Sequence, residues 1–398
     1  MTRTIMMVLA AGMLLTACHK DKDEKEKELA AQSVLVYIAG DNNLESFIAS
    51  DVRQLMQGSA ELTEGNNLLM YVDRQGKLPY FMKVEKGDTV RVMTMEKESK
   101  SSNTETLKNA MKWMTDNYEA KNYGLVLWGH ADGWIIHNSS KSRSGGPRHA
   151  YAQDTTNGEE WMNIPDMALA LSTLPHLRFI FADCCCFQSV ESAYELRNVA
   201  DYIIASAAEI PGEGAPYQTV IPALFSQRDD FYQQAAAAYY EQVSYGYREP
   251  MAVVKTSEME NLAQATKTAL KQSLEPISNG EGYPSVSGLI YYYDKTLFDM
   301  NDFILSITEE NVYQEWKRTF DAAVPYKVMV DVWMSDGHVP YIDYNGTFFR
   351  DFEVTEERYG GVSMFVPQNS SKYLINLQNT TINQMQWYKA AGLDELGW

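Results

Sequence analysis

The chain has 398 residues, 45% of them hydrophobic and 22% charged, a composition that is ordinary for a globular protein and argues against disorder outside the N-terminus. Its net charge of −19 argues against nucleic acid as a partner, because phosphate groups repel so acidic a surface. Cys18 stands alone and the other three cysteines are adjacent at 184–186, so separated disulfide partners and zinc-ligand spacing are both missing. We therefore predict neither a disulfide scaffold nor a metal-ligand set.

The N-terminus has the pattern of an export signal. Residues 2–17 contain one early charge, Arg3, and then an apolar run over residues 5–15. This run is shorter than the ~20 residues of a membrane-spanning helix and is typical of the core of a signal peptide. The letters LTAC, which end at Cys18, resemble a bacterial lipobox, and this resemblance implies cleavage before Cys18 and lipid attachment to it.

We accordingly predict a lipoprotein signal peptide at residues 1–17 and a flexible, charged tether at residues 18–32, which includes HKDKDEKEKE. The expected location is the outer membrane or cell surface of a bacterium, with the N-terminal lipid as the membrane contact. Ordinary signal-peptide cleavage beside an incidental cysteine is the alternative.

Continuous apolar runs, typical of strands buried on both faces, alternate with segments of helical periodicity. In chain order we predict a strand at 34–39, a helix at 44–56, a strand at 68–72, a hairpin at 80–84 and 90–93, a helix at 104–118, a strand at 125–128, a helix at 164–174, a strand at 179–182, a helix at 189–196, and strands at 202–205, 251–254 and 361–366. The alternation predicts an α/β fold with a mostly parallel central sheet and helices on both faces.

Reactive side chains follow two of these strands directly. His130 comes after the strand at 125–128, and the three cysteines come after the strand at 179–182. Ligand sites of open parallel sheets form at the carboxyl ends of strands, so the two groups meet if their strands are neighbours. A thiol beside an imidazole is suited to nucleophilic acyl transfer. The alternative is a packing or surface histidine and a cysteine in the core.

Several segments resemble blocks of the clostripain family of cysteine peptidases, in family order. They are VLVYIAGDNNL at 34–44, GLVLWGHADGW at 124–134, FADCCCFQSVESAYEL at 181–196, ASAAEIPGEGAPY at 205–217, GGVSMFVP at 360–367 and QWYKAAG at 386–392. The resemblance implies a caspase-like α/β/α sandwich with a catalytic domain at 33–257 and a C-terminal accessory subdomain at 258–398. It places the nucleophile at Cys185 and its acid/base partner at His130.

The same resemblance implies cleavage after Arg or Lys. Asp183 matches the acidic residue at the base of the family's substrate pocket, and Glu213 is either a second pocket wall or a solvated turn residue. The backbone N–H groups of Ala131 and Cys185 correspond to the family's oxyanion hole. Ala131 replaces the usual glycine, and alanine disfavours a positive φ, so activity is expected to suffer if the loop needs that angle.

Between the two motifs lies a loop at 139–148, rich in Ser, Gly and Arg, that carries Lys141, Arg143 and Arg148. Because family members cut themselves after basic residues, the resemblance implies self-processing here, and a plain surface loop is the alternative. Some relatives use calcium, so calcium stays open as a cofactor although the sequence contains no EF-hand-like loop.

The sequence thus predicts a lipid-anchored cysteine endopeptidase that acts on proteins or peptides with Arg or Lys at the cleavage site. The main alternative is a catalytically silent, peptide-binding surface lipoprotein on the same scaffold. A peptidase that cleaves after Asn or Asp is disfavoured by Asp183, because an acidic pocket repels an acidic side chain. A structural adhesin would leave the histidine and cysteine motifs unexplained.

Overall fold

The computed structural model describes residues 29–136, 150–156, 160–242, 248–293, 295–335 and 351–398. In this part of the chain a nine-stranded sheet runs in the order β12-β10-β9-β8-β5-β1-β2-β3-β4. Its strands are β1 (Ala30–Gly40), β2 (Asn66–Arg74), β3 (Tyr80–Glu85), β4 (Asp88–Thr94), β5 (Ala120–Trp128), β8 (Leu177–Asp183), β9 (Ala200–Ala205), β10 (Ala252–Lys255) and β12 (Tyr326–Lys327). The five strands from β9 to β2 in this order pair in parallel, and the outer strands pair antiparallel.

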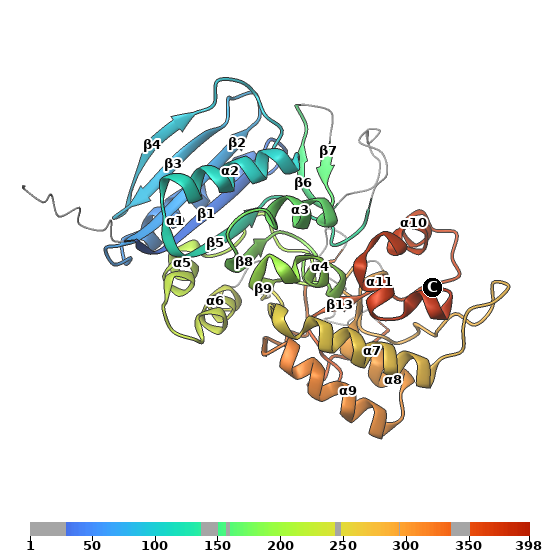
Figure 1. Ribbon diagram of the computed structural model, residues 1–398. Coiled ribbons are helices and arrows are strands. Elements are labelled where there is room, and N and C mark those ends of the chain that lie inside the picture. Colours follow the sequence, from blue (N-terminus) through green and yellow to red (C-terminus); the bar gives the residue numbers. More distant parts are fainter. Residues whose placement is uncertain (1–28, 137–149, 157–159, 243–247, 294, 336–350) are drawn as a thin grey trace, which may run out of the picture.

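Helices cover both faces of the sheet, as Figure 1 shows. The helices are α1 (Glu45–Ser59), α2 (Thr104–Asn117), α3 (Ile164–Leu171), α4 (Val190–Glu195), α5 (Tyr217–Phe225), α6 (Phe231–Tyr240), α7 (Met259–Ser273), α8 (Met300–Ile307), α9 (Glu310–Ala323), α10 (Tyr373–Thr381) and α11 (Gln386–Ala390). Two small sheets pair β6 (Tyr151–Asp154) with β7 (Glu160–Met162) and β11 (Phe298–Asp299) with β13 (Ser363–Met364).

Strand β1 shows why the central strands are apolar throughout. Its side chains alternate between two cores: Leu35 and Tyr37 pack with α2, α3 and α4, and Val34 and Val36 pack with α1, α5 and α6. All four are fully buried, which is what a parallel strand covered on both faces requires. The structure therefore confirms the predicted α/β fold with a mostly parallel sheet.

The folded region begins earlier than the predicted tether boundary at residue 32. Ala31 donates its N–H to the carbonyl of Gly65 at 2.7 Å, and Ala30 donates to the carbonyl of Glu119, so β1 starts at Ala30. Backbone pairing with both neighbouring strands extends β1 over residues whose side chains are not hydrophobic enough to show a strand pattern. Residues 1–17, most of the tether and Cys18 lie outside the described residues.

The C-terminal region contributes to the same architecture. Its strand β12 adds the last position of the sheet beside β10, and the side chains of α7, α8 and α9 share one hydrophobic core with β1 and β5. The division at residue 257 stays a prediction.

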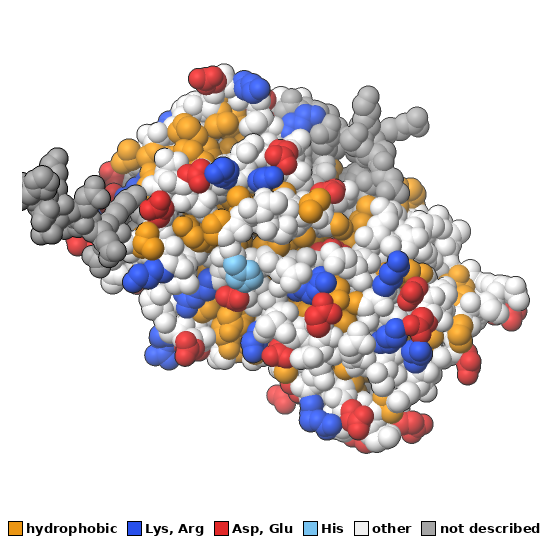
Figure 2. All heavy atoms as spheres, viewed as in Figure 1, with side chains coloured by type: hydrophobic (Ala, Val, Ile, Leu, Met, Phe, Trp, Pro, Cys, Tyr) orange, Lys and Arg blue, Asp and Glu red, His pale blue; other side chains and the backbone are white. Residues whose placement is uncertain are grey.

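Within the described residues no helix is long and apolar enough to cross a membrane. Figure 2 shows acidic and basic side chains intermixed on the viewed face, with apolar side chains between them.

Truncation of Leu35 tests the importance of the buried central strand. Leu35 is fully buried in β1, and we expect Leu35→Ala to lower the free energy of unfolding by about 3 kcal/mol, through lost apolar burial and a cavity. The matched control is Leu169→Ala, because Leu169 on α3 is 71% exposed and should change stability by under ~0.5 kcal/mol. Urea denaturation of both variants measures the difference, and equal losses would contradict the assigned core.

Candidate active site

Strands β5 and β8 are neighbours in the sheet, and this adjacency brings the two predicted motifs together. Trp128 at the end of β5 pairs with Asp183 at the end of β8. His130 and Cys185 each follow two residues later and both line one small pocket of about 70 Å³. The pocket is lined by Leu44, Trp128, Gly129, His130, Asp183, Cys185, Ile210, Pro211, Gly212 and Gly214.

The three adjacent cysteines occupy three different environments. Cys184 is buried in the main core, and this burial raises the pKa of its thiol well above the ordinary value. Cys186 is fully buried in a second apolar cluster, with a φ of +54°, and its N–H donates to the Ala208 carbonyl at 2.8 Å. Cys185 is half-buried and lines the pocket. A molecule in the pocket can therefore reach the thiol of Cys185 and not those of its neighbours.

The loop after β9 holds the sulfur of Cys185. The Ile210 N–H donates to the Cys185 Sγ at 3.4 Å, and the Ile210 carbonyl oxygen lies 3.7 Å from this sulfur. The N–H contact suits the thiolate, which is the nucleophilic form of cysteine, and the carbonyl contact suits the neutral thiol. The backbone of Ile210 can therefore hold the sulfur in both forms.

His130 is positioned by a backbone ladder and by side-chain contacts, among them those with Asn43 and the ring of Trp161. Its carbonyl accepts the Ala152 N–H at 2.9 Å, which ties it to β6. Its ring Nε2 lies 2.5 Å from Asn43 Oδ1, on the turn after β1. Because an amide oxygen only accepts, this hydrogen bond requires the tautomer of His130 that carries a proton on Nε2. Asn43 lies near the end of the first family-like segment, VLVYIAGDNNL at 34–44. No feature of the sequence marked it as a neighbour of His130.

Ala131 fits its backbone position without strain. The described non-glycine residues with a positive φ are Lys86, Ala152, Cys186, Asn279 and Lys295, and Ala131 is not one of them. The condition under which alanine was expected to impair activity is therefore not met. Ala131 pairs with Tyr151 in an antiparallel bridge formed by the N–H groups of Ala152 and Asp132. This leaves the Ala131 N–H outside the bridge, on the opposite side of the segment.

Asp183 is a buried carboxylate at one wall of the pocket. Its Oδ2 accepts the Tyr217 hydroxyl at 2.6 Å and the Ala215 N–H at 3.0 Å, and its Oδ1 accepts the Tyr239 hydroxyl at 3.2 Å. Burial raises the pKa of Asp183, and these three hydrogen bonds oppose the rise. A carboxylate has about four acceptor sites, so one remains for a donor that enters from the pocket.

A glycine makes room at this carboxylate. Gly214 has a φ of +60°, and a Cβ built there would lie 2.7 Å from Asp183 Oδ2. Glu213, its neighbour in the turn, is half-buried and is not among the residues that line the pocket. The basic residues Lys141, Arg143 and Arg148 lie outside the described residues.

A second carboxylate behind the pocket was not predicted from the sequence. Asp51 on α1 is fully buried and accepts the indole N–H of Trp128 at 2.7 Å. Burial, together with the nearby charges of Asp183 and Glu213, raises the pKa of Asp51 to about 8. The sequence predicted α1 from its helical periodicity, but this periodicity did not show that Asp51 faces inward.

The raised pKa of Asp51 predicts a pH-dependent stability. Between its unfolded pKa near 4 and its folded pKa near 8, the folded state binds the proton more tightly, so the folded state loses stability as pH rises through this window. In Asp51→Asn this loss between pH 5 and pH 9 should shrink by about 2 kcal/mol or more. Thermal or urea unfolding at both pH values measures it, and an unchanged difference would contradict the assignment.

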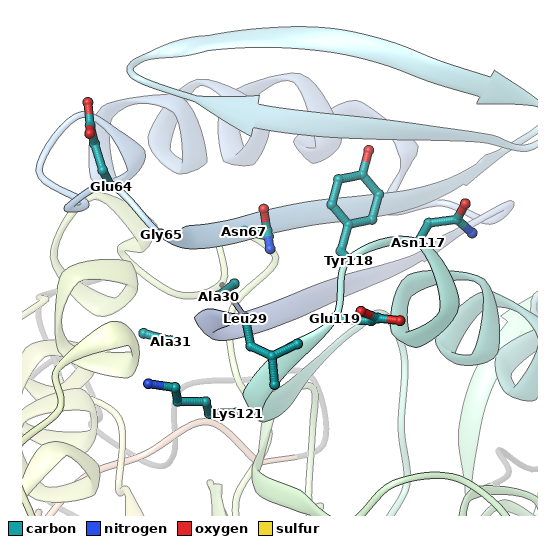
Figure 3. Close-up of a pocket in the computed structure, with 10 residues that line it drawn as sticks. All are labelled: Leu29, Ala30, Ala31, Glu64, Gly65, Asn67, Asn117, Tyr118, Glu119 and Lys121. Atoms are coloured by element: carbon teal, nitrogen blue, oxygen red, sulfur yellow. The ribbon is translucent and has the colours of Figure 1, made fainter. Parts of the chain in front are cut away.

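A larger hollow of about 590 Å³ lies at the other end of the sheet (Figure 3). It is formed where β1, β2 and β5 begin, with Ala30, Asn67 and Lys121 among its lining residues. The hollow contains no cysteine or histidine, so its lining offers no nucleophile paired with a base. The chemistry therefore points to the smaller pocket at the carboxyl ends of the strands.

A reactive thiol and an imidazole at the carboxyl ends of adjacent parallel strands, beside a buried carboxylate, define the class of cysteine-dependent hydrolases on an α/β scaffold. A family model described as the clostripain family matches residues 36–396. The chain belongs to the clostripain (C11) family and is a cysteine peptidase.

Solved structures of related proteases cover almost the whole chain. A secreted C11 cysteine protease from Bacteroides thetaiotaomicron, in complex with an irreversible peptide inhibitor, is 30% identical with a TM-score of 0.74, and the match covers 92% of this chain and 100% of that one. An inactive zymogen C11 protease from Parabacteroides distasonis is 27% identical with a TM-score of 0.73, over 92% and 99%. A comparison with curated protein sequences gave no match.

Proposed function

We propose that this protein is an endopeptidase that cleaves after Arg or Lys, with Cys185 as nucleophile and His130 as general acid and base. The observation that carries the proposal is the shared pocket, whose lining joins the accessible thiol of Cys185, the imidazole of His130 and the buried carboxylate of Asp183. The protease named above from Bacteroides thetaiotaomicron was solved with a peptide inhibitor, which supports a peptide as the substrate.

The proposed reaction begins when the Cys185 thiolate attacks the carbonyl carbon of the scissile peptide bond. The thiol proton has already passed to His130 to form this thiolate, and the attack makes a C–S bond while the C=O double bond opens to an oxyanion. His130 then donates this proton to the leaving amine as the C–N bond breaks, which leaves an acyl-enzyme. His130 then takes a proton from water, whose oxygen attacks the thioester carbonyl. The C–S bond breaks, His130 returns the proton to the Cys185 sulfur, and the carboxylic acid product leaves and ionises in solution.

The oxyanion that forms in both steps needs hydrogen-bond donors that are already in place. We assign this role to the backbone N–H groups of Cys185 and Ala131. The bridge geometry supports Ala131, because the ladder to β6 uses the N–H groups of Ala152 and Asp132 rather than its own. Because Ala131 has no positive φ, the usual glycine is not required for this donor.

A cationic substrate side chain is the natural partner of Asp183. A buried carboxylate with a raised pKa gains most from a guanidinium or ammonium group, which restores its charged form and fills its remaining acceptor site. Asp51 lies close enough to Asp183 to interact electrostatically, but its pKa of about 8 leaves it largely uncharged at neutral pH, so the attraction of a cation falls to Asp183. An Asp side chain in the substrate would meet repulsion at the same place.

Processing and location extend this proposal to segments outside the described residues. We propose self-cleavage after Lys141, Arg143 or Arg148, in line with the zymogen named for the Parabacteroides distasonis relative. We also propose lipid attachment at Cys18 and a position on the outer membrane or cell surface. The relative from Bacteroides thetaiotaomicron is described as secreted, which supports export of this protein. The proposed lipid attachment rests on the lipobox-like sequence at Cys18 alone.

The test is the hydrolysis of fluorogenic peptides ending in Arg, Lys, Asn or Asp, together with N-terminal sequencing of any fragments of the protein itself. We expect turnover with Arg and Lys only, and a new N-terminus directly after a basic residue of the 139–148 loop. Turnover after Asn or Asp would overturn the specificity. Binding of peptides without turnover, even after trypsin cuts the loop, would support the silent binding lipoprotein instead.

A further inference from the structure

The turn between β1 and α1 brings a polar side chain directly against the proposed catalytic histidine. Asn43 lies in this turn, and its Oδ1 is 2.5 Å from the Nε2 of His130. Two atoms this close form a direct hydrogen bond, with no room for a water molecule between them. Among the described residues, His130 lines the substrate pocket and Asn43 does not. A change at Asn43 therefore acts on a bound peptide through the histidine.

The residue before it, Asn42, fixes the place of Asn43. The Asn42 side chain is buried and donates through Nδ2 to the carbonyls of Ala39 and Gln153, both at 2.9 Å. Its Oδ1 accepts the Leu44 N–H at 2.9 Å, a hydrogen bond that spans Asn43 and closes an Asx turn. The turn is thus anchored to both β1 and β6, and the Asn43 side chain projects from a fixed backbone.

Strand β6 holds both partners of this contact. The Ala152 N–H of β6 donates to the His130 carbonyl at 2.9 Å. Directly after β6, Thr155 donates its N–H and its hydroxyl to the Asp41 carbonyl, both at 2.9 Å. Because one strand fixes the backbone of the histidine and of the turn, the amide of Asn43 and the imidazole are held at a constant separation.

The contact decides which nitrogen of the imidazole acts as the base. The side-chain oxygen of Asn43 only accepts hydrogen bonds, so in the neutral ring of His130 Nε2 carries the proton and Nδ1 carries the lone pair. A general base takes up a proton at its lone pair, which here is on Nδ1. When the ring is protonated, Nε2 still donates to Asn43, and this hydrogen bond strengthens because its donor is then charged. The ring therefore keeps its orientation throughout the reaction.

We propose that Asn43 is a positioning residue of the peptidase, which holds His130 through Nε2 so that Nδ1 exchanges the proton with the Cys185 sulfur and the leaving amine. The inference rests on the proposed function and adds to it the working nitrogen and the group that orients it. The geometry supports this division, because His130 and Cys185 line one pocket while Asn43 lies outside it. A neutral amide also orients the ring without adding a negative charge, which would disfavour the nearby thiolate.

Asn43→Ala is the first test, made with the purified protein and a fluorogenic arginine peptide. It should lower kcat by about 10²-fold, the lower range of what general acid–base catalysis contributes, and leave KM within about twofold. The fold should be unaffected, because Asn43 is exposed and the side chain of Asn42 secures the turn. The matched control is Asn117→Ala, which should leave both constants unchanged. Asn117 is also exposed, donates to the Trp113 carbonyl, and lines the hollow at the other end of the sheet (Figure 3).

Asn43→Asp gives a measurement that a merely structural role would not move. A carboxylate still accepts the Nε2 proton, so kcat should recover to within about tenfold of the unmodified protein. The added negative charge stabilises the protonated ring of His130 and disfavours the thiolate of Cys185. Both effects should move the pH profile of kcat/KM to higher pH, by about one pH unit.

Alkylation of Cys185 by iodoacetamide at pH 6 separates this inference from the proposed function, because it needs no peptide turnover. An activated Cys185 should react fast, and Asn43→Ala should slow it by about tenfold. Slow alkylation in the unmodified protein would overturn the pairing of Cys185 with His130, and this inference with it. Fast alkylation that Asn43→Ala leaves unchanged would overturn the inference alone. An unchanged kcat in Asn43→Ala, or a pH profile that Asn43→Asp does not move, would do the same.

Discussion

Cys185→Ala is expected to lower kcat/KM for a peptide ending in arginine by about four orders of magnitude or more, the scale of losing a covalent nucleophile. Cys185 is the thiol that lines the pocket with His130, and its sulfur accepts the Ile210 N–H. Alanine cannot form the acyl-enzyme, so only substrate binding and the oxyanion donors can still accelerate hydrolysis in this variant. Initial rates with a fluorogenic arginine peptide measure the effect, and self-cleavage should stop with it.

The control is Cys184→Ala, one residue earlier in the chain. Cys184 is fully enclosed in the main core, where burial keeps its thiol neutral, so this change should leave kcat/KM within about tenfold and mainly reduce stability. Alkylation by iodoacetamide gives a second measurement, because Cys185 should react much faster than either neighbour. Activity that survives in Cys185→Ala and disappears in Cys184→Ala would identify Cys184 as the nucleophile instead.

The sheet was predictable because its strands are buried on both faces. Runs such as VLVYIA, within β1, and LVLW, at the end of β5, contain no polar interruption, and a parallel strand under two helical layers permits none. The positions of His130 and Cys185 followed from the same signal, since each comes within three residues after such a run. That their strands are neighbours was left open as a condition, and the pairing of β5 with β8 meets it.

Two helices of the fold, α5 and α6, escaped prediction for physical reasons. Helix α5 contains Pro222, which weakens the helical signal, and the alanine-rich α6 carries little contrast between its faces. Both are held in place by packing on the sheet beside α1 rather than by a strong local pattern. Tertiary contacts therefore decide their structure more than propensity does.

The polar part of the site was the least visible in the sequence. Asn43 lies on the turn after β1 and Asp51 on α1, and no spacing rule links either residue to His130 or Cys185. Asp51 interrupts the amphipathic helix α1, and an acidic residue in such a helix is usually expected to face solvent. Only the packed fold, in which Asp51 is fully buried and bonded to the Trp128 indole, shows that this carboxyl group is enclosed.

Asp183→Asn is expected to lower kcat/KM for arginine and lysine peptides by about 10³-fold, the scale of removing one partner from a buried charge pair. Asparagine keeps the shape of the side chain and can still accept the Ala215 N–H and the Tyr217 hydroxyl. Its amide group, however, has no negative charge and presents N–H donors toward a guanidinium that also only donates.

The matched control for this prediction is Glu213→Gln, which removes an equal charge from a residue that does not line the pocket. It should change kcat/KM for the same peptides by less than about tenfold, a small effect expected of a partly solvated charge. A peptide with an uncharged norleucine at the cleavage site separates specificity from damage, because Asp183→Asn should hydrolyse it no more slowly than the unmodified protein does. If instead both peptides slow equally, Asp183 supports the pocket through Tyr217 and Tyr239, and the partner of the substrate cation must be Asp51 or Glu213.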